Sequence, residues 1–142
     1  MKWFKDFVAG GKARLARYNN ATFKEGAMAA AALITTADGK IDASEIDGVV
    51  KFIAASEALS AFDASELGDL FRANCEKATD LFKKLDLIKK VAKLKADAPS
   101  ADQCVRMAVI IANQDGDFAE SEKKVVRDLC TALGLKADEY LE

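Results

Sequence analysis

Hydrophobic residues recur at three- and four-residue intervals along most of the chain, which is the spacing of amphipathic α-helices. The longest such stripe lies in residues 79–95. Its members are Leu81, Phe82, Leu85, Ile88, Val91 and Leu94. No segment alternates hydrophobic and polar residues at a period of two, so nothing in the pattern indicates a β-sheet. The chain is therefore predicted to be all-α.

Capping and turn residues divide this pattern into separate helices. An alanine-rich segment over residues 22–36 predicts a central, buried helix, because small side chains let neighbouring helices approach closely. Asp63 followed by Glu66 has the form of a capping box, Pro99 suits a first helical turn, and Gly134 suits a C-terminal cap. The predicted helices are residues 1–18, residues 22–36, a helix that carries Ile46, Val49, Val50 and Ile53, a helix that begins at Asp63, residues 79–95, residues 99–113, a helix from the Asp115-Gly116 turn to Gly134, and a last turn within residues 135–142.

The charge along the chain separates a basic start from an acidic remainder. Residues 1–24 carry six basic side chains and one acidic one, a local charge of +5, whereas the other residues sum to −7. We expect residues 1–18 to form a basic leader helix and residues 19–142 to form one globular domain, because 142 residues suffice for a single core. Two interpretations of the leader stay open. It either packs on the core with its basic face in water, or contacts an acidic partner or an anionic membrane surface.

The composition disfavours catalysis and several kinds of binding. The chain contains no histidine, so the commonest general base and metal ligand is absent, and Ser44 and Ser121 lack a histidine to activate them. The chain has neither a glycine-rich phosphate loop nor a basic face interleaved with aromatic residues beyond residue 24. We therefore expect no catalytic residues, no organic cofactor and no nucleic-acid partner.

The cysteines and the hydropathy indicate a cytoplasmic protein. Cys75, Cys104 and Cys130 match no zinc motif and are odd in number, which favours buried thiols in a reducing compartment over a redox role. We expect no signal peptide, because Lys5, Asp6 and Lys12 interrupt the first apolar stretches. No segment approaches the roughly 18 consecutive apolar residues of a membrane span.

One helix–turn–helix segment occurs twice, at a constant offset of 77 residues without a gap. Residues 33–45 match residues 110–122, and the match continues downstream where Val49 aligns with Val126. Both copies keep an Asp-Gly pair, a following apolar residue, a serine and a glutamate at the same positions. Two copies are too few for a solenoid, so the repeat predicts a globule of two pseudo-symmetric halves.

The repeated acidic residues have two interpretations. Helix capping explains Asp42 with Glu45, but the equivalent of Asp42 is Ala119, so the second cap would have to move to Asp117 with Glu120 or to another residue. The alternative is a site for calcium or magnesium, because crowded carboxylates repel and a hard cation relieves that repulsion with oxygen ligands. The loop is not an EF-hand, since its Gly is second and its Glu eighth. The candidate metal ligands are Asp38, Asp42, Glu45, Asp115, Asp117 and Glu122.

At these residues the chain resembles the TerB family of tellurite-resistance proteins. The resemblance rests on residues 37–45, residues 56–59, Asp115-Gly116-Asp117-Phe118 leading to Glu122, and Leu133-Gly134-Leu135. It covers about residues 20 to 140, and the double Asp-Gly pattern is its most specific feature. The lysine-rich segment 78–95 departs from the more acidic or glycine-rich character expected of the family, which puts in doubt any site that includes it.

The resemblance implies a fold, a role and partners. It implies a bundle of about seven helices with two pseudo-symmetric repeats, and a non-enzymatic role in bacterial tellurite resistance and stress response. It further implies action at the cytoplasmic face of the membrane, with an integral-membrane partner of the TerC type and calcium-binding partners of the TerD type. Metal binding then carries over to Asp38, Glu45, Asp115 and Glu122, and less directly to Asp42 and Asp117. The alternative is a metal-free adaptor whose basic leader meets an acidic partner or an anionic membrane surface.

Overall fold

The computed structural model of this protein describes residues 2–8 and 18–142, and these form helices without any strand. The described elements are α1 (Lys2–Val8), α2 (Ala21–Thr35), α3 (Ala43–Ala55), the 3₁₀ helix η1 (Glu57–Leu59), α4 (Ala64–Ala78), α5 (Leu81–Ala92), the 3₁₀ helix η2 (Lys93–Ala96), α6 (Ala98–Ala112), α7 (Glu120–Leu133) and α8 (Asp138–Leu141). The predicted all-α class is confirmed. None of these helices has both the length and the apolar character that crossing a membrane requires.

Helix α2 is the centre of the bundle, as the alanine run predicted. Phe23 and every residue from Gly26 to Ile34 are buried, and α2 contacts each of the helices from α3 to α7. Small side chains suit this position because helices pack against α2 from several sides. The helix begins where the Asn20 side chain accepts a hydrogen bond from the Phe23 N–H at 2.8 Å.

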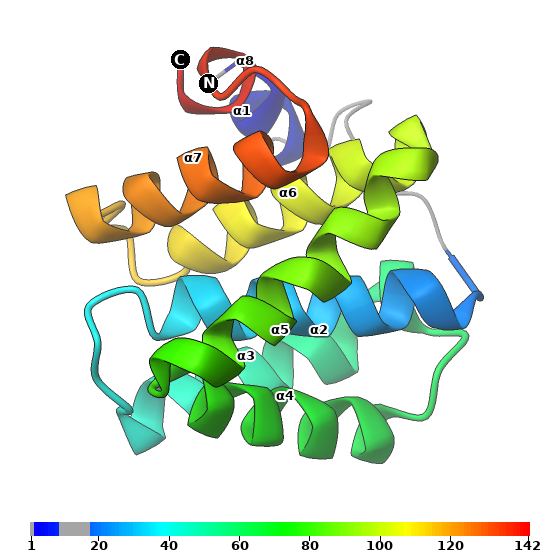
Figure 1. Cartoon of the computed structure of the whole chain (residues 1–142), viewed down its shortest axis with the longest axis vertical. Coiled ribbons are helices and arrows are strands. Elements are labelled where there is room, and N and C mark those ends of the chain that lie inside the picture. The colour runs from blue at the N-terminus through cyan, green and yellow to red at the C-terminus, as the bar shows by residue number, and fades with distance from the viewer. Residues whose placement is uncertain (1, 9–17) are drawn as a thin grey trace.

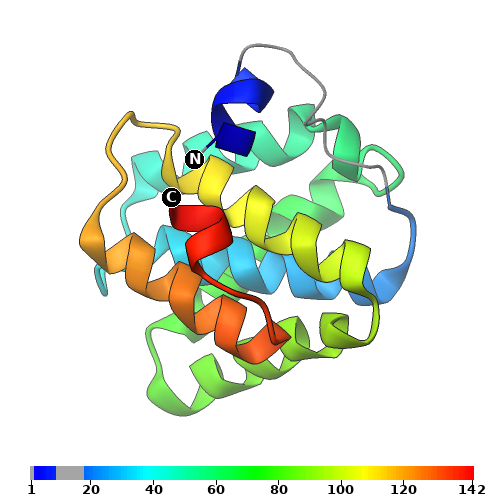
Figure 2. The same ribbon diagram turned by 90° about the horizontal axis from the view of Figure 1, so that it is seen from above.

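The remaining helices lie around α2 in an ordered way. Figure 1 shows α6 and α7 on one side of α2, α3 and α4 on the other, and α5 crossing in front of it. Seen from above, α1 and α8 lie on the side of α6 and α7, with both chain ends close together (Figure 2). The Tyr140 hydroxyl of α8 donates to Asp102 Oδ1 of α6 at 2.6 Å, and the Arg106 guanidinium lies 5.1 Å from the ring centroid of Trp3 of α1.

The internal repeat appears in the structure as two helix–turn–helix units of nearly equal length. Helices α2 and α6 are related by the 77-residue offset at both ends, and α3 and α7 begin at the same offset. Gly39 and Gly116 follow the first helix of each unit, and both have φ of 80°. The left-handed backbone lets the chain leave the helix and turn, which explains why both copies keep glycine there.

Two details differ from the sequence-based expectations, and a third expectation lies partly outside the described residues. The stripe of residues 79–95 does not face the core as one unit, because Leu81, Phe82 and Leu85 are exposed, and α5 packs through Leu87, Val91 and the η2 residue Leu94. The predicted helix 79–95 becomes α5, capped by Asp80, followed by η2. Of the predicted leader helix 1–18, residues 2–8 form α1, and residues 9–17 lie outside the described residues. The division into a leader of residues 1–18 and a domain of residues 19–142 stays a prediction.

Replacing Gly116 with alanine is expected to lower the free energy of unfolding by about 1 kcal/mol, because a Cβ disfavours positive φ. The matched control is Gly48→Ala within α3, where a Cβ meets nothing within 4 Å and φ is not positive. Alanine there is expected to stabilise by about 0.5–1 kcal/mol through its helix propensity. Urea unfolding of both variants measures the two effects, and equal midpoints would show that the turn does not require glycine.

Candidate functional site

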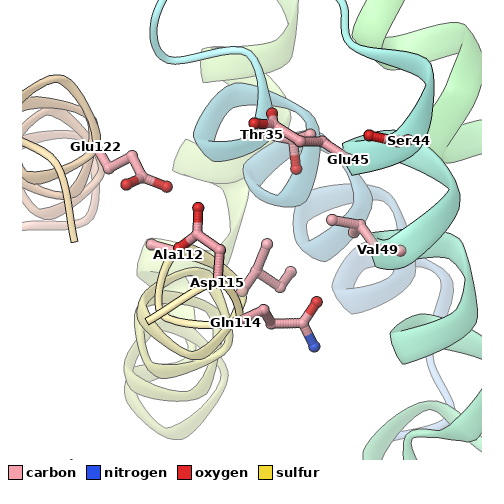
Figure 3. Close-up of a pocket in the computed structure, with 10 residues that line it drawn as sticks. Thr35, Ser44, Glu45, Val49, Ala112, Gln114, Asp115 and Glu122 are labelled. Carbon is pink, nitrogen blue, oxygen red and sulfur yellow. The ribbon is translucent and has the colours of Figure 1, made fainter. Parts of the chain in front are cut away.

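A cleft of about 350 Å³ lies between the two repeats, where the first turn of α3 faces the end of α6 and the start of α7 (Figure 3). Its lining is shared between both units: Thr35, Ser44, Glu45, Gly48 and Val49 come from the first, and Ile111, Ala112, Gln114, Asp115 and Glu122 from the second. Six of the ten lining residues carry side-chain oxygen atoms, and the other four are Gly48, Val49, Ile111 and Ala112. The pairing of α2 with α6 in the core is what brings the two turns together.

Three carboxylates line this cleft. Glu45 projects from the first turn of α3, while Asp115 follows α6 and Glu122 lies in the first turn of α7. Figure 3 shows the carboxylates of Asp115 and Glu122 turned toward each other, with Glu45 on the opposite side of the cleft. Among the six predicted metal ligands, these are the three that the fold brings to one place.

The two Asp-Gly turns have the same local structure. The Asp38 side chain accepts a hydrogen bond from the Lys40 N–H at 3.0 Å, and the Asp115 side chain accepts one from the Asp117 N–H at 3.0 Å. Each aspartate therefore stabilises its own turn through one oxygen, as Asx turns do. Only Asp115 also lines the cleft, and Asp38, Asp42 and Asp117 are not among the lining residues.

The helices that follow the turns are capped in different ways. Asp42 caps α3, since its Oδ1 accepts from the N–H groups of Ser44 at 2.9 Å and Glu45 at 3.1 Å. Helix α7 has Ala119 at the N-cap, and Glu122 Oε1 accepts from the Ala119 N–H at 2.8 Å. The second cap thus moves neither to Asp117 nor to Glu120, and Glu122 provides half of a capping box from within the helix.

Electrostatic repulsion connects the acidic residues on both sides of the cleft. Partial burial raises the pKa of Glu45, and the charges of Asp42, Asp38 and Asp115 raise it further. Burial also raises the pKa of Glu122, against its hydrogen bond from Ala119, and Asp115, Asp117 and Glu45 add to the increase. Glu45 and Glu122 therefore repel each other across the cleft although they lie 77 residues apart in sequence.

In contrast, the cap residue Asp42 has a lowered pKa. The Ser44 hydroxyl, which donates to Asp42 Oδ1 at 2.8 Å, is the main cause, and the two backbone hydrogen bonds contribute the rest. This carboxylate is stabilised as an anion without any cation. Capping is thus the observed role of Asp42, whereas the geometry gives Glu45 no comparable hydrogen-bond partner among the described residues.

Three polar residues of the cleft were not predicted as part of it: Thr35, Ser44 and Gln114. Thr35 aligns with Ala112 and Gln114 aligns with Ala37, so a comparison of the repeats could not single them out. Ser44 does recur as Ser121, but this recurrence fits capping equally well. Because the Thr35 hydroxyl already donates to the Ala31 carbonyl at 2.7 Å, it has its lone pairs available to a ligand.

The donors of the cleft are chemically suited to a hard cation, since carboxylate, hydroxyl and amide oxygens are the ligands that calcium and magnesium prefer. Within residues 2–8 and 18–142, however, no three Asp, Glu or Cys side chains are arranged to hold one metal ion. Direct ligation by Glu45, Asp115 and Glu122 together would therefore require their side chains to converge. A hydrated ion needs less convergence, because water molecules fill part of its coordination shell.

The three cysteines do not line the cleft. Cys75, Cys104 and Cys130 are all buried and free, as expected. Burial raises the pKa of the Cys75 and Cys104 thiols to about 12 and that of Cys130 to about 11. Very little thiolate is present at neutral pH, so these residues are poor nucleophiles and poor ligands for a soft tellurium oxyanion.

Comparison with known proteins identifies the family of this chain. No curated protein and no solved structure matches the chain. The family model described as tellurite resistance protein TerB matches residues 24–142, which include both repeats and the whole cleft. The match covers more than half of the chain, and so the chain belongs to the tellurite resistance protein TerB family.

Proposed function

We propose that this protein is a non-enzymatic, divalent-cation-binding interaction module of a bacterial tellurite-resistance and stress-response system. The observation that carries the proposal is the cleft itself, in which Glu45 from one repeat faces Asp115 and Glu122 from the other. Each of the two glutamates has a raised pKa, so positive charge is favoured at this place over further negative charge. Calcium and magnesium are the proposed ions.

The dimensions of the cleft suit a cation that retains water. A water molecule occupies about 30 Å³ in the liquid, so six of them need roughly 180 Å³, and the cleft offers about 350 Å³. Magnesium characteristically keeps several waters and uses one or two carboxylates. Such an ion would relieve the repulsion between the repeats without requiring three carboxylates to meet at one point.

Cation binding would act on the arrangement of the two repeats. Glu45 moves with α3, and Asp115 and Glu122 move with the turn between α6 and α7, so an ion between them would link these elements. A partner protein that contacts this face would then distinguish the cation-bound from the cation-free molecule. From the family we propose partners of the TerC and TerD types and a location at the cytoplasmic face of the membrane.

Isothermal titration with calcium and with magnesium tests the cleft. We expect the E45Q/E122Q double variant to bind at least tenfold more weakly than the wild type, because it loses two charges that face the ion. Glutamine at position 122 can still accept the hydrogen bond from the Ala119 N–H, so the cap of α7 is retained. The matched control is E66Q/E76Q, which removes two exposed charges from α4, away from the cleft.

The result of that control decides the interpretation. Wild-type heats for E66Q/E76Q together with weak binding by E45Q/E122Q support the cleft. Equal heats from all three proteins would remove Glu45 and Glu122 as ligands and, with them, the proposed role of the cleft.

A metal-free adaptor is the second candidate, and the exposure of Lys2 and Lys5 on α1 favours it. Trp3 and Phe4 pack against the core, so α1 presents these two lysines to solvent. An acidic partner or an anionic membrane surface would then be bound by the leader. If binding to an acidic partner or to an anionic membrane surface is unaffected by K2E/K5E or by added salt, this candidate is removed.

A further inference from the structure

Three of the first five residues of α5 are exposed hydrophobic side chains that neither the core nor the cation cleft uses. Leu81 is 74% exposed, Phe82 is 80% exposed and Leu85 is 51% exposed. Among the described residues only one other large hydrophobic side chain, Ile41, is exposed, at 44%. Single exposed hydrophobic residues are normal on protein surfaces, whereas contiguous exposed apolar patches mark interaction sites. We call Leu81, Phe82 and Leu85 the α5 wedge.

The wedge is presented by a well-formed helix end. Asp80 Oδ1 accepts hydrogen bonds from the Phe82 N–H at 2.9 Å and the Lys83 N–H at 3.2 Å, so the first turn of α5 is capped. On its other face, Leu87 and Val91 are buried, and α5 contacts α2, α4 and α7. Both views show α5 at the outside of the bundle, and in Figure 1 it begins at the lower left, far from α1 and α8.

The segment that contains the wedge is rich in lysine. Residues 77–95 contain seven lysines and two aspartates, a local charge of +5. Lys90 pairs with Glu25 at 3.5 Å. Among the described residues no carboxylate lies within 4.0 Å of the other six, which are Lys77, Lys83, Lys84, Lys89, Lys93 and Lys95. The opposing charges in this segment are Asp80, which is engaged in the cap, and Asp86.

We propose that the α5 wedge inserts into the boundary between headgroups and acyl chains of an anionic lipid bilayer, with the neighbouring lysines on the headgroups. Apolar side chains on a helix together with basic residues are the features that bind this boundary. Each lysine near an anionic surface strengthens binding about fivefold. This surface would provide the contact for the proposed membrane location, and it does not depend on the cation cleft.

The charges and the shape favour a bilayer over other occupants. A second copy of the chain placed face to face on α5 would bring two lysine-rich segments of charge +5 together, and they would repel. A protein partner would need a pocket shaped for three side chains that project from a helix end. A bilayer accepts such a projection without a preformed pocket, because its acyl chains rearrange around the inserted groups.

Co-sedimentation of the full-length protein with vesicles tests the inference. The vesicles consist either of phosphatidylcholine alone or of phosphatidylcholine with phosphatidylglycerol, and the protein is expected to bind the second kind. The L81S/F82S variant is expected to bind at least tenfold more weakly, because two large side chains no longer leave water on binding. The matched control is I41S, which removes an exposed hydrophobic side chain outside α5 and is expected to bind as the wild type does.

The lysines are tested separately. K89E/K93E is expected to reduce binding to the phosphatidylglycerol vesicles by more than tenfold and to shift its salt dependence. The control K51E/K136E reverses two exposed lysines on α3 and in the loop after α7, and is expected to bind more tightly than K89E/K93E. Unchanged circular dichroism and urea midpoints establish that the exposed substitutions leave the fold intact.

Three outcomes would overturn the inference. Equal losses for I41S and L81S/F82S would show that general hydrophobicity, and not the wedge, governs binding. Loss of binding in K2E/K5E with normal binding in L81S/F82S would assign the membrane contact to α1. If the protein self-associates in sedimentation velocity, L81S/F82S abolishes this self-association and no vesicle binding is seen, the wedge would be assigned to contact with a second copy of the chain. The calorimetric titration of the cation cleft would be unaffected by any of these outcomes.

Discussion

Replacing Ala30 with leucine is expected to lower the free energy of unfolding by about 3 kcal/mol, which is a large part of the stability of a domain this size. Ala30 is 1% exposed and lies in a run of buried alanines in α2, around which five other helices pack. Three additional carbon atoms have no space there, so α2 or its neighbours would have to shift. Urea unfolding followed by far-ultraviolet circular dichroism measures the loss.

An alanine on the surface of another helix provides the control. Ala73 is exposed on α4, and leucine there is expected to change the stability by less than about 0.5 kcal/mol. If Ala30→Leu and Ala73→Leu unfold at the same urea concentration, α2 is not the tightly packed centre that its burial indicates.

Saturating magnesium or calcium is expected to raise the free energy of unfolding by about 2.7 kcal/mol at neutral pH, when the free ion is about 100 times its dissociation constant. The proposed ion would bind the folded cleft and not the unfolded chain, because Glu45 and the residues of the second repeat line one cleft only when the chain is folded. The increase is expected to vanish as the pH falls below the ordinary glutamate pKa of 4.5, because protonated carboxyl groups do not bind cations. Thermal unfolding with and without the ion, at a series of pH values, measures this increase in stability.

Without the ion, Glu45 and Glu122 are expected to make stability depend on pH in the opposite sense. Their pKa values in the folded protein lie above the ordinary value of 4.5. Their contribution to stability is therefore fully present below pH 4.5 and is lost as the pH rises through the folded-state values. The lowered pKa of Asp42 has the opposite effect on stability. Its contribution is present above the ordinary pKa of 3.8 and is lost as the pH falls through its lower value in the folded protein.

The E45Q/E122Q variant separates these two effects. It is expected to be more stable than the wild type at neutral pH in the absence of divalent ions, and to gain nothing when they are added. E66Q/E76Q is expected to behave like the wild type in both conditions. A wild type that is as stable as E45Q/E122Q without ions would mean that repulsion across the cleft is negligible.

The repeat explains why so much of the backbone could be predicted. Local interactions determine the Asp-Gly turns, since Gly39 and Gly116 adopt the same φ of 80° and Asp38 and Asp115 make the same hydrogen bond. The Pro99 and Gly134 assignments are confirmed for the same reason, because each depends only on neighbouring residues. The all-α class and the central place of the alanine-rich helix follow from periodicity and side-chain size.

The cleft shows the limit of that reasoning. Equivalent residues in two repeats share a local conformation, yet a site between the repeats has two different sides, and so Asp115 lines it while Asp38 does not. Glu122 combines a cap with a place in the cleft, a double role that appears only when Ala119 is seen at the N-cap. The identity of the residues opposite Glu45 depends on how α3 is placed against α6 and α7.

From the sequence alone came the helices, the turns, the twofold repeat and the acidic character of its turns, because these depend on residues that are close along the chain. Tertiary structure decided which carboxylates share one cleft and which half of the 79–95 stripe stays in water. Leu81 and Val91 belong to the same apolar stripe, but Val91 is buried in the bundle and Leu81 lies on its surface. The physical reason is that burial depends on which helices lie above a side chain, and periodicity along one helix does not contain that information.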